Sequence, residues 1–265
     1  SRSQEDARGL TIDATVLDLF AAHGAVVGRW KVQAATEWLW IGGETTYFRT
    51  PTNPDLLKLQ QYGGAVRLQA ERTRFGGRLE VGLASGDDRP FDDTVRNLKF
   101  ASDYRIGMVM FGEGIRRITA VGAANLADPR FTGSAPQGFE RLATAGALAQ
   151  AIYINPVVRF EPFSDIALLC GLLWAQAPLP LVDPYQTGLA GGALRNQRGG
   201  KASGELGFEV DGAVRWKKSL GAGLSLHLRL DAGVWLPGDA FDDLDGRPSA
   251  AVGVVASQVL LTGEW

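Results

Sequence analysis

The sequence has few of the residues from which disulfides, metal centres and histidine-dependent active sites are built. Its 265 residues include one cysteine, Cys170, and two histidines, His23 and His227. A lone cysteine excludes an intrachain disulfide, and so few thiolate and imidazole ligands give no reason to expect a structural metal. Two acidic stretches, 86–93 and 238–246, lack the closing glutamate of a calcium-binding EF-hand loop. We expect no metal and no cofactor.

The chain also lacks a long hydrophobic run and a surplus of charge of one sign. Its longest apolar stretch, 166–175, is about half as long as a helix that crosses a bilayer. The net charge of −2 argues against a nucleic-acid partner, which would require a basic stripe. Residues 1–9 are polar and charged, so no secretory signal peptide opens the chain, and for an exported protein this predicts a processed or shortened form.

Catalysis by the histidines is not expected either. Ser225, His227 and Asp231 have the same parity on one predicted strand, where neighbours on one face lie roughly 6.6 Å apart. A serine–histidine hydrogen bond needs about 3 Å, so this strand cannot form a relay by itself. The glycines fall at turns and on strand faces, and no phosphate-binding loop is present. We predict that the chain is not an enzyme.

Strict alternation of apolar and polar residues, in contrast, runs through most of the sequence. In 26–41, Trp30, Trp38 and Trp40 fall on one side, while Lys31 and Glu37 fall on the other. Similar alternation recurs in 66–71, 78–83, 152–161, 203–217 and 224–236. A helical period would mix these charges with the apolar residues, so the pattern predicts an all-β chain.

The C-terminal residues, 255–265, form one more alternating stretch and end on an aromatic residue, Trp265. A strand that stops on an aromatic residue resembles the C-terminal strand of a bacterial outer-membrane β-barrel. Trp30 and Trp38 lie roughly 27 Å apart along a strand at about 3.3 Å per residue, which is close to the spacing of the two aromatic girdles of such a barrel. In that architecture the apolar face meets lipid and the polar face lines the lumen.

The predicted connections alternate between tight turns and long polar loops. The tight turns are expected at 23–24, 73–76, 112–114, 162–163 and 219–222, and the long loops at 42–57, 86–103, 127–145, 177–202 and 237–249. This parity is typical of an up-and-down transmembrane barrel with short periplasmic turns and long outer loops. A soluble β-sandwich has no reason to keep it.

Counting back from Trp265 at the periplasmic rim places about eleven strands, the first at 11–22. Single-chain bacterial barrels have even numbers of strands with both termini at the periplasmic side. An odd number indicates either a miscount around 105–125 or the C-terminal part of a larger barrel. We favour the second interpretation, treat 1–265 as a single barrel domain, and expect an open or partly open sheet if several strands are absent.

Several short motifs are similar to those of a group of large outer-membrane barrel proteins common in myxobacteria and related Gram-negative bacteria. These proteins are distantly similar to alginate-export-type porins. The motifs are LDLFAAHG (17–24), ASGDD (84–88), FASDYRIGMVMF (100–111), VDPY (182–185), LGFEVD (206–211) and WLPGDAFDD (235–243). The resemblance implies a barrel in the outer membrane with extra strands before the region seen here. It does not imply a substrate.

The two strand faces supply the candidate functional residues. The predicted pore lining comprises Arg29, Lys31, Arg67, Arg78, Glu80, Arg159, Glu209, Asp211, Arg215, Arg229 and Asp231. The predicted membrane girdle comprises Trp30, Trp38, Trp40, Trp174, Trp216 and Trp265. Rings of charge can set the ion preference of a water-filled pore. The same charges could instead form cross-strand ion pairs that brace the wall, and the sequence leaves both interpretations open.

We predict a bacterial outer-membrane porin or channel through which small polar or charged solutes diffuse passively. Its expected partners are the lipid bilayer and, through the C-terminal strand, the barrel-assembly machinery. Two alternatives remain. One is a plugged structural or adhesion barrel that binds a partner through its outer loops. The other is a soluble β-protein that binds lipid or carbohydrate, for which Trp30, Trp38, Trp174 and Trp216 should be buried.

Overall fold

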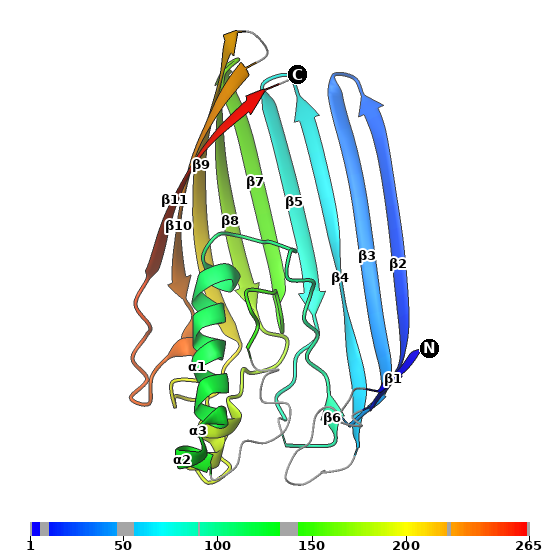
Figure 1. The fold of residues 1–265 in the computed structure, drawn as a ribbon, viewed down its shortest axis with the longest axis vertical. Coiled ribbons are helices and arrows are strands. Elements are labelled where there is room, and N and C mark those ends of the chain that lie inside the picture. The colour runs from blue at the N-terminus through cyan, green and yellow to red at the C-terminus, as the bar shows by residue number, and fades with distance from the viewer. Residues whose placement is uncertain are drawn as a thin grey trace.

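The computed structural model describes residues 2–5, 11–46, 56–89, 91–132, 143–221 and 224–263. They form one sheet in which consecutive strands pair antiparallel in the order β1-β2-β3-β4-β5-β7-β8-β9-β10-β11, with β6 beside β4 (Figure 1). The strands are β1 (Arg2–Glu5), β2 (Thr11–Val27), β3 (Trp30–Thr45), β4 (Leu57–Arg72), β5 (Phe75–Ala84), β6 (Thr94–Val95), β7 (Ile152–Phe163), β8 (Ile166–Gln176), β9 (Glu205–Gly221), β10 (Leu224–Pro237) and β11 (Val252–Gly263). The predicted all-β, antiparallel up-and-down fold is confirmed.

Short turns gather at one end of the sheet and long connections at the other (Figure 1). The short turns are 28–29, 73–74 and 164–165, and residues 222–223 lie outside the described part of the chain. The long connections are 46–56, 85–151, 177–204 and 238–251. We call these two ends the short-turn end and the long-loop end. The predicted alternation of short turns and long loops therefore holds, although the turns predicted at 23–24 and 112–114 are wrong and the one predicted at 162–163 lies two residues later, after β7 ends at Phe163.

The turn predicted at His23-Gly24 is wrong, because β2 continues through both residues. The alternation persists to Val27, which pairs with Trp30 at the start of β3. The chain reverses at Gly28, whose φ of 61° lies in the left-handed region that glycine adopts without steric cost. A glycine inside an alternating run is therefore compatible with a strand, and the reversal comes where the alternation stops.

The turn predicted at Gly112-Glu113-Gly114, with strands on either side, is also wrong. These residues belong to a π-helix, η1 (Met110–Ile115), which continues into α1 (Arg116–Ala127) and is followed by α2 (Pro129–Thr132). The loops predicted at 86–103 and 127–145 are parts of the same connection, 85–151. Ile115, Gly122 and Leu126 are buried at helical spacing, and this packing fixes the segment as a helix.

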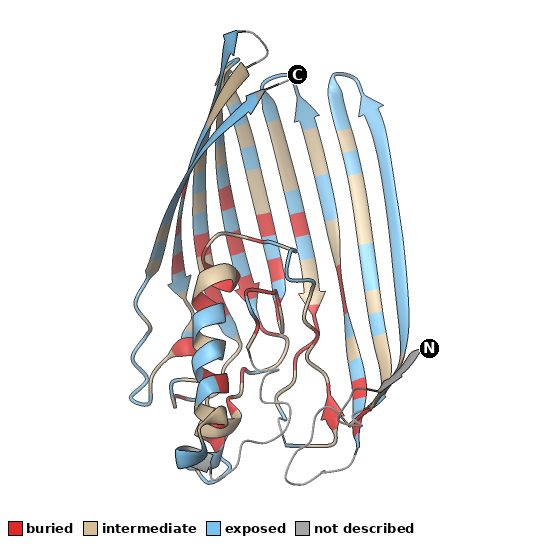
Figure 2. Ribbon diagram, viewed as in Figure 1, coloured by how far each residue is buried: buried red, intermediate tan, exposed pale blue. Residues whose placement is uncertain are grey.

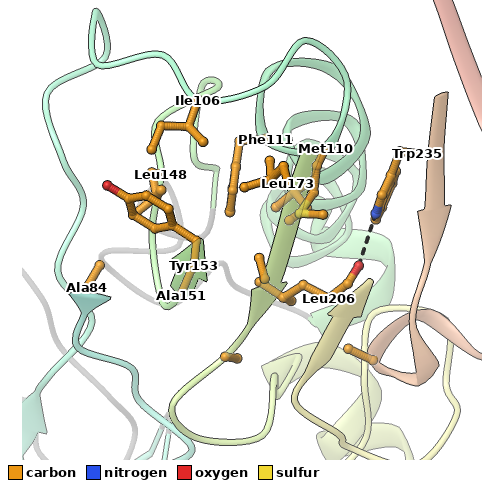
Figure 3. Close-up of a cluster of buried hydrophobic side chains, with 14 of the residues drawn as sticks. Ala84, Ile106, Met110, Phe111, Leu148, Ala151, Tyr153, Leu173, Leu206 and Trp235 are labelled. Carbon is orange, nitrogen blue, oxygen red and sulfur yellow. Dashed lines mark hydrogen bonds between the residues drawn. The ribbon is translucent and has the colours of Figure 1, made fainter. Parts of the chain in front are cut away.

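Connection 85–151 folds back over the half of the sheet at the long-loop end, where most of the buried residues of the wall strands lie (Figure 2). We call the face that it covers the inner face. The core between the two includes Met110 and Phe111 from the connection and Tyr153, Leu173 and Trp235 from the strands (Figure 3). Two further short helices, α3 (Pro184–Leu189) and η3 (Asp239–Phe241), lie in the connections that follow β8 and β10.

None of the helices in the described ranges is long and apolar enough to cross a membrane.

Candidate functional site

Strand register divides the side chains between the two faces of the sheet. Arg67 pairs with Glu80, and Arg215 pairs with Arg229, so each pair shares a face. Since successive residues point to opposite faces, the register can be followed from β3 to β10. It places ten of the predicted pore-lining residues on the inner face: Lys31, Arg67, Arg78, Glu80, Arg159, Glu209, Asp211, Arg215, Arg229 and Asp231. The eleventh, Arg29, lies in the turn between β2 and β3.

The opposite, outer face carries the tryptophans predicted for the girdle. Trp30, Trp38, Trp40 and Trp174 are 37%, 48%, 45% and 39% exposed. Around them the outer face shows a continuous set of exposed apolar side chains from strand to strand: Leu68, Leu79, Val81, Ile154, Val158, Leu168, Leu172, Val210, Val214, Leu228, Leu230, Val234, Val255 and Val259. So large an exposed apolar surface marks a site of contact with another apolar phase. A soluble binding protein requires Trp30, Trp38, Trp174 and Trp216 to be buried, but the first three are exposed and Trp216 is half-buried.

Aromatic side chains on the outer face fall into two groups. Near the short-turn end, Trp30 lies beside the first turn, Phe75 stacks on Phe160 with ring centroids 4.9 Å apart, and the Trp216 indole donates a hydrogen bond to the Asp165 carboxylate at 3.1 Å. The second group lies nearer the long-loop end and contains Trp38, Trp40, Tyr62 and Trp174. Trp265 lies outside the described residues.

Glu209 holds the infolded connection to the wall. Its side chain is fully buried, and its two carboxylate oxygens accept hydrogen bonds from three successive backbone N–H groups. The Met108 and Val109 amides donate to Oε1 at 2.5 and 2.8 Å, and the Met110 amide donates to Oε2 at 2.6 Å. These bonds satisfy three donors where η1 begins, which would otherwise be buried without partners.

Glu80 forms a second attachment, about halfway along β5. It is 2% exposed, and its Oε2 accepts a hydrogen bond from Arg67 Nε at 2.7 Å. Its Oε1 accepts a hydrogen bond from the hydroxyl of Tyr104, which comes from the connection and also contacts the hydroxyl of Tyr153 on β7. The buried carboxylate is thus paired with a cation and bonded to the connection, as a buried charge requires.

The sequence placed Glu80 and Glu209 on the correct face but could not show that they anchor the connection. Their partners lie 24 residues away at Tyr104 and 99–101 residues away at 108–110. Tyr104, Tyr153 and Trp235 were missed as well. The Trp235 indole donates a hydrogen bond to the Leu206 carbonyl at 3.0 Å (Figure 3). Its ring packs edge-on against Phe241. The only feature of the sequence that could have indicated the position of Trp235 is that it alternates in step with the polar residues of its strand, and so falls on their face.

Charges on the uncovered half of the inner face are partly paired. Arg159 pairs with Glu161, and Arg229 Nε lies 2.5 Å from Asp231 Oδ2; each pair is formed two residues apart along one strand. Arg78 donates to the Asn155 amide oxygen at 3.2 Å. Arg215 makes no ion pair within the described part of the chain. This face therefore carries both charges that form ion pairs within the wall and charges, such as that of Arg215, that do not.

Two carboxyls in the long connections are perturbed by burial. Burial raises the pKa of Asp87, although the backbone N–H groups of Arg96 and Arg89 donate to its carboxylate and oppose the rise. Burial also raises the pKa of Asp183, which caps the N-terminus of α3 by accepting a hydrogen bond from the Gln186 amide at 2.8 Å. Both groups organise the loops at the long-loop end.

Both histidines lie on strands of the sheet. His227 Nε2 lies 3.3 Å from the Thr262 hydroxyl, and His23 lies on the outer face of β2, opposite Ala34. Among the residues that the structure describes, no group of three or more His, Cys, Asp or Glu side chains could hold a metal ion.

The fold and the division of its faces define an antiparallel, up-and-down β-sheet wall that is largely apolar on one face and charged on the other. In structure the chain is similar to OccK2 (OpdF) of Pseudomonas aeruginosa, with a TM-score of 0.43 and 10% sequence identity. The alignment covers 99% of this chain and 57% of that one, so the chain spans little more than half the length of that structure. No family model and no curated protein matches the sequence. The resemblance to the myxobacterial group and to alginate-export-type porins stays a prediction.

Proposed function

We propose that this chain forms part of the wall of a bacterial outer-membrane channel through which small polar or charged solutes diffuse passively. The observation that carries the proposal is the division between the two faces of the sheet. Register collects most of the charged residues of the strands on the inner face, and the exceptions, such as Glu44, Lys58, Arg72 and Lys218, lie near strand ends. The large exposed apolar residues form a continuous set on the outer face. A bilayer can cover such an outer face, and water can fill the space next to such an inner face.

In this proposal the aromatic groups on the outer face sit at the two membrane interfaces. Trp30 and Trp216 lie close to the short turns, and Trp38, Trp40 and Trp174 lie further toward the long-loop end. Aromatic girdles of this kind flank the apolar band of transmembrane barrels. The short-turn end would face the periplasm, and the C-terminal strand, which ends there, would be the segment that the barrel-assembly machinery engages.

The edges of the sheet support a larger barrel. Within the described residues, β11 pairs with β10 on one edge and with no strand on the other, and β2 beyond Ala14 pairs with β3 alone. Unpaired backbone groups are not tolerated in the hydrocarbon region, so further strands would have to cover both edges. Amide hydrogen exchange of the full-length protein in lipid tests this. Protection of β11 equal to that of β8 is expected, whereas fast exchange along β11 would rule out closure.

Connection 85–151 gives the channel a constriction and raises a second candidate function. It fills the space over the inner face at the long-loop end with a packed apolar core. If the full barrel leaves no path beside this core, the protein is a plugged barrel that binds a partner through its outer loops. The uncovered, charged half of the inner face favours the channel, because a plugged structural barrel has no need of unpaired lumen cations.

Two measurements test the proposal. Tryptophan fluorescence of the protein refolded into liposomes should be quenched strongly by brominated lipid, since four tryptophans are exposed on the outer face. No quenching, with a folded β signal in plain buffer, would contradict a membrane location. Planar-bilayer recordings should then show conductance, and neutralising Arg78, Arg159, Arg215 and Arg229 together should shift the reversal potential toward cation selectivity. Negligible conductance would favour the plugged barrel.

A further inference from the structure

Two neighbouring rungs of the β9–β10 pair bring basic side chains together. Arg215 lies directly opposite Arg229, and Lys217 lies directly opposite His227. Directly opposed residues of an antiparallel pair have Cβ atoms about 5 Å apart, and like charges in this position destabilise the sheet. The register therefore places Arg215, Arg229, Lys217 and His227 in one column on the inner face near the short turns, and the ion pair between Arg229 and Asp231 offsets only part of the repulsion between the two arginines.

The strands on either side do not neutralise this column. On β8, Arg215 faces Ala167, and on β11, Arg229 faces Gln258. Three carboxylates near the column are already engaged: Asp231 pairs with Arg229, Glu161 with Arg159, and Asp165 accepts the Trp216 indole hydrogen bond. Asp211, four residues before Arg215 on the same strand, lines an adjoining hollow and pairs with neither Arg215 nor Lys217. Arg215 and Lys217 form no ion pair with any described residue. Two guanidinium or ammonium groups are thus left without counter-charge.

A hollow opens over the same residues. A cavity of about 400 Å³ is lined by Arg215, Lys217, His227 and Arg229, and its lining also includes Glu161, Asp165 and Gln258. Two smaller hollows adjoin it along the inner face, and Arg215 lines both of them together with Arg78. Arg159 lines one and Arg105, from the infolded connection, lines the other. Arg215 is the residue common to all three.

We propose that this column, with Arg215 at its centre, is a binding site for small anions that carry carboxylate or phosphate groups. Such groups accept charge-assisted hydrogen bonds from guanidinium in a bidentate geometry, and a bound anion would offset the repulsion between the opposed basic residues. The assignment deepens the proposed channel function, since it names the class of solute held at the periplasmic mouth, but binding itself does not require conduction.

Thermal unfolding of the full chain refolded into detergent tests the site without measuring a current. Inorganic phosphate and succinate, each compared with chloride at equal ionic strength, should raise the Tm by about 2–4 °C. Arg215→Gln should abolish this rise and should itself raise the Tm at low ionic strength, because it removes the opposed like charge. Lys217→Gln serves as a second variant at the next rung and should reduce the rise.

Lys31→Gln is the matched control, since Lys31 lies on the same inner face but opposite a carboxylate, Glu71. It should keep the full anion-dependent rise. A rise with one probe alone supports the site and identifies the group it binds. No rise with either probe, or an equal rise in the wild type and Arg215→Gln, overturns the proposal, because general salt exclusion would stabilise every variant equally. A chain that shows the rise but conducts no ions would refute the channel and leave the site intact.

Discussion

Glu209 and Arg215 lie six residues apart on the inner face of β9, roughly 20 Å along the strand, in halves of the sheet that have opposite surroundings. Glu209 is fully buried and binds three backbone amides of the infolded connection. Arg215 is exposed, has no ion-pair partner among the described residues and faces another arginine. The two residues have the same parity in one alternating sequence, so alternation alone does not decide what an inner-face charge does.

The difference arises from the connections and not from the wall. Between Glu209 and Arg215 the strands keep one register, and the outer face is apolar in both halves away from the strand ends. At the long-loop end, connection 85–151 is long enough to fold back and bring its own apolar residues and polar backbone to the wall. At the short-turn end the connections are too short to cover anything, and the charges of the wall remain available to solutes.

The largest effect is expected from removing the anchor of the covered half. Glu209→Ala would leave three buried N–H groups without an acceptor, at a cost of about 1–3 kcal/mol each, or about 3–6 kcal/mol together when the effects are not fully additive. We expect segment 104–115 to detach from the wall, so that the covered half comes to resemble the open one. Denaturant unfolding should show the loss of stability, and limited proteolysis should show new cleavage within 104–115.

Glu209→Gln provides the control for this change. Its amide oxygen can still accept the bonds from Met108 and Val109, and one donor, the Met110 amide, loses its acceptor. The loss should therefore be about 1–3 kcal/mol. Equal stability of the wild type and Glu209→Ala would show that the connection is held by its apolar core alone.

A second prediction concerns the outer face, which is apolar in both the covered and the uncovered half of the sheet. Leu68 lies opposite Ala34, midway between Trp30 and Trp38, and is 47% exposed. Leu68→Arg should cost about 2–4 kcal/mol of folding free energy in lipid, as for a cation at the bilayer midplane. Gln33→Arg, on the inner face, should cost close to nothing. Reversible unfolding in liposomes measures both, and equal effects would remove the distinction between the faces.

The sequence was sufficient for the strands and for their two faces. Alternation over more than ten residues, as in 26–41 or 224–236, specifies both the extended conformation and the face of each residue, because a one-residue slip would reverse every side chain. It failed at 105–125, where apolar residues such as Met108, Val109 and Met110 are also compatible with a strand. What makes this segment helical is its packing against Tyr153, Leu173 and Trp235, which are distant in the sequence.

For the candidate site, alternation predicted which charged residues share a face but not the role of each charge. Glu80, Glu209 and Arg215 have similar local patterns. Their roles differ because of partners far along the chain: a tyrosine hydroxyl, three backbone amides and an opposed arginine, respectively. Such partners depend on how the connection folds back and on strand register. Neither can be predicted from the sequence immediately around the residue.

A third prediction tests how tightly the covered half is packed. A Cβ on Gly114, in η1, would come within 2.1 Å of Trp235 Cζ3, whereas a Cβ on Gly112 would meet the Arg105 guanidinium at 3.5 Å. Gly114→Ala should therefore displace the indole and cost about 1–3 kcal/mol, the usual range for overpacking. Gly112→Ala should be neutral or slightly stabilising. The fluorescence of Trp235 and the Tm report on both variants. If Gly114→Ala has the same fluorescence and Tm as the wild type, the core around Trp235 is loosely packed.

The smallest effect is expected at Asp183, on the rim of the covered half. Burial raises the pKa of its carboxyl in the folded state, so the folded protein retains this proton to higher pH than the unfolded chain does. Stability should then fall as the pH rises from the ordinary aspartate range through the raised pKa, and stay lower above it. Asp183→Asn preserves the acceptor for the Gln186 amide and has no proton to lose. Its Tm should match that of the wild type at acid pH and exceed it by about 1–2 °C at neutral pH. A difference that does not change with pH would mean that the capping bond, and not the buried charge, distinguishes the two side chains.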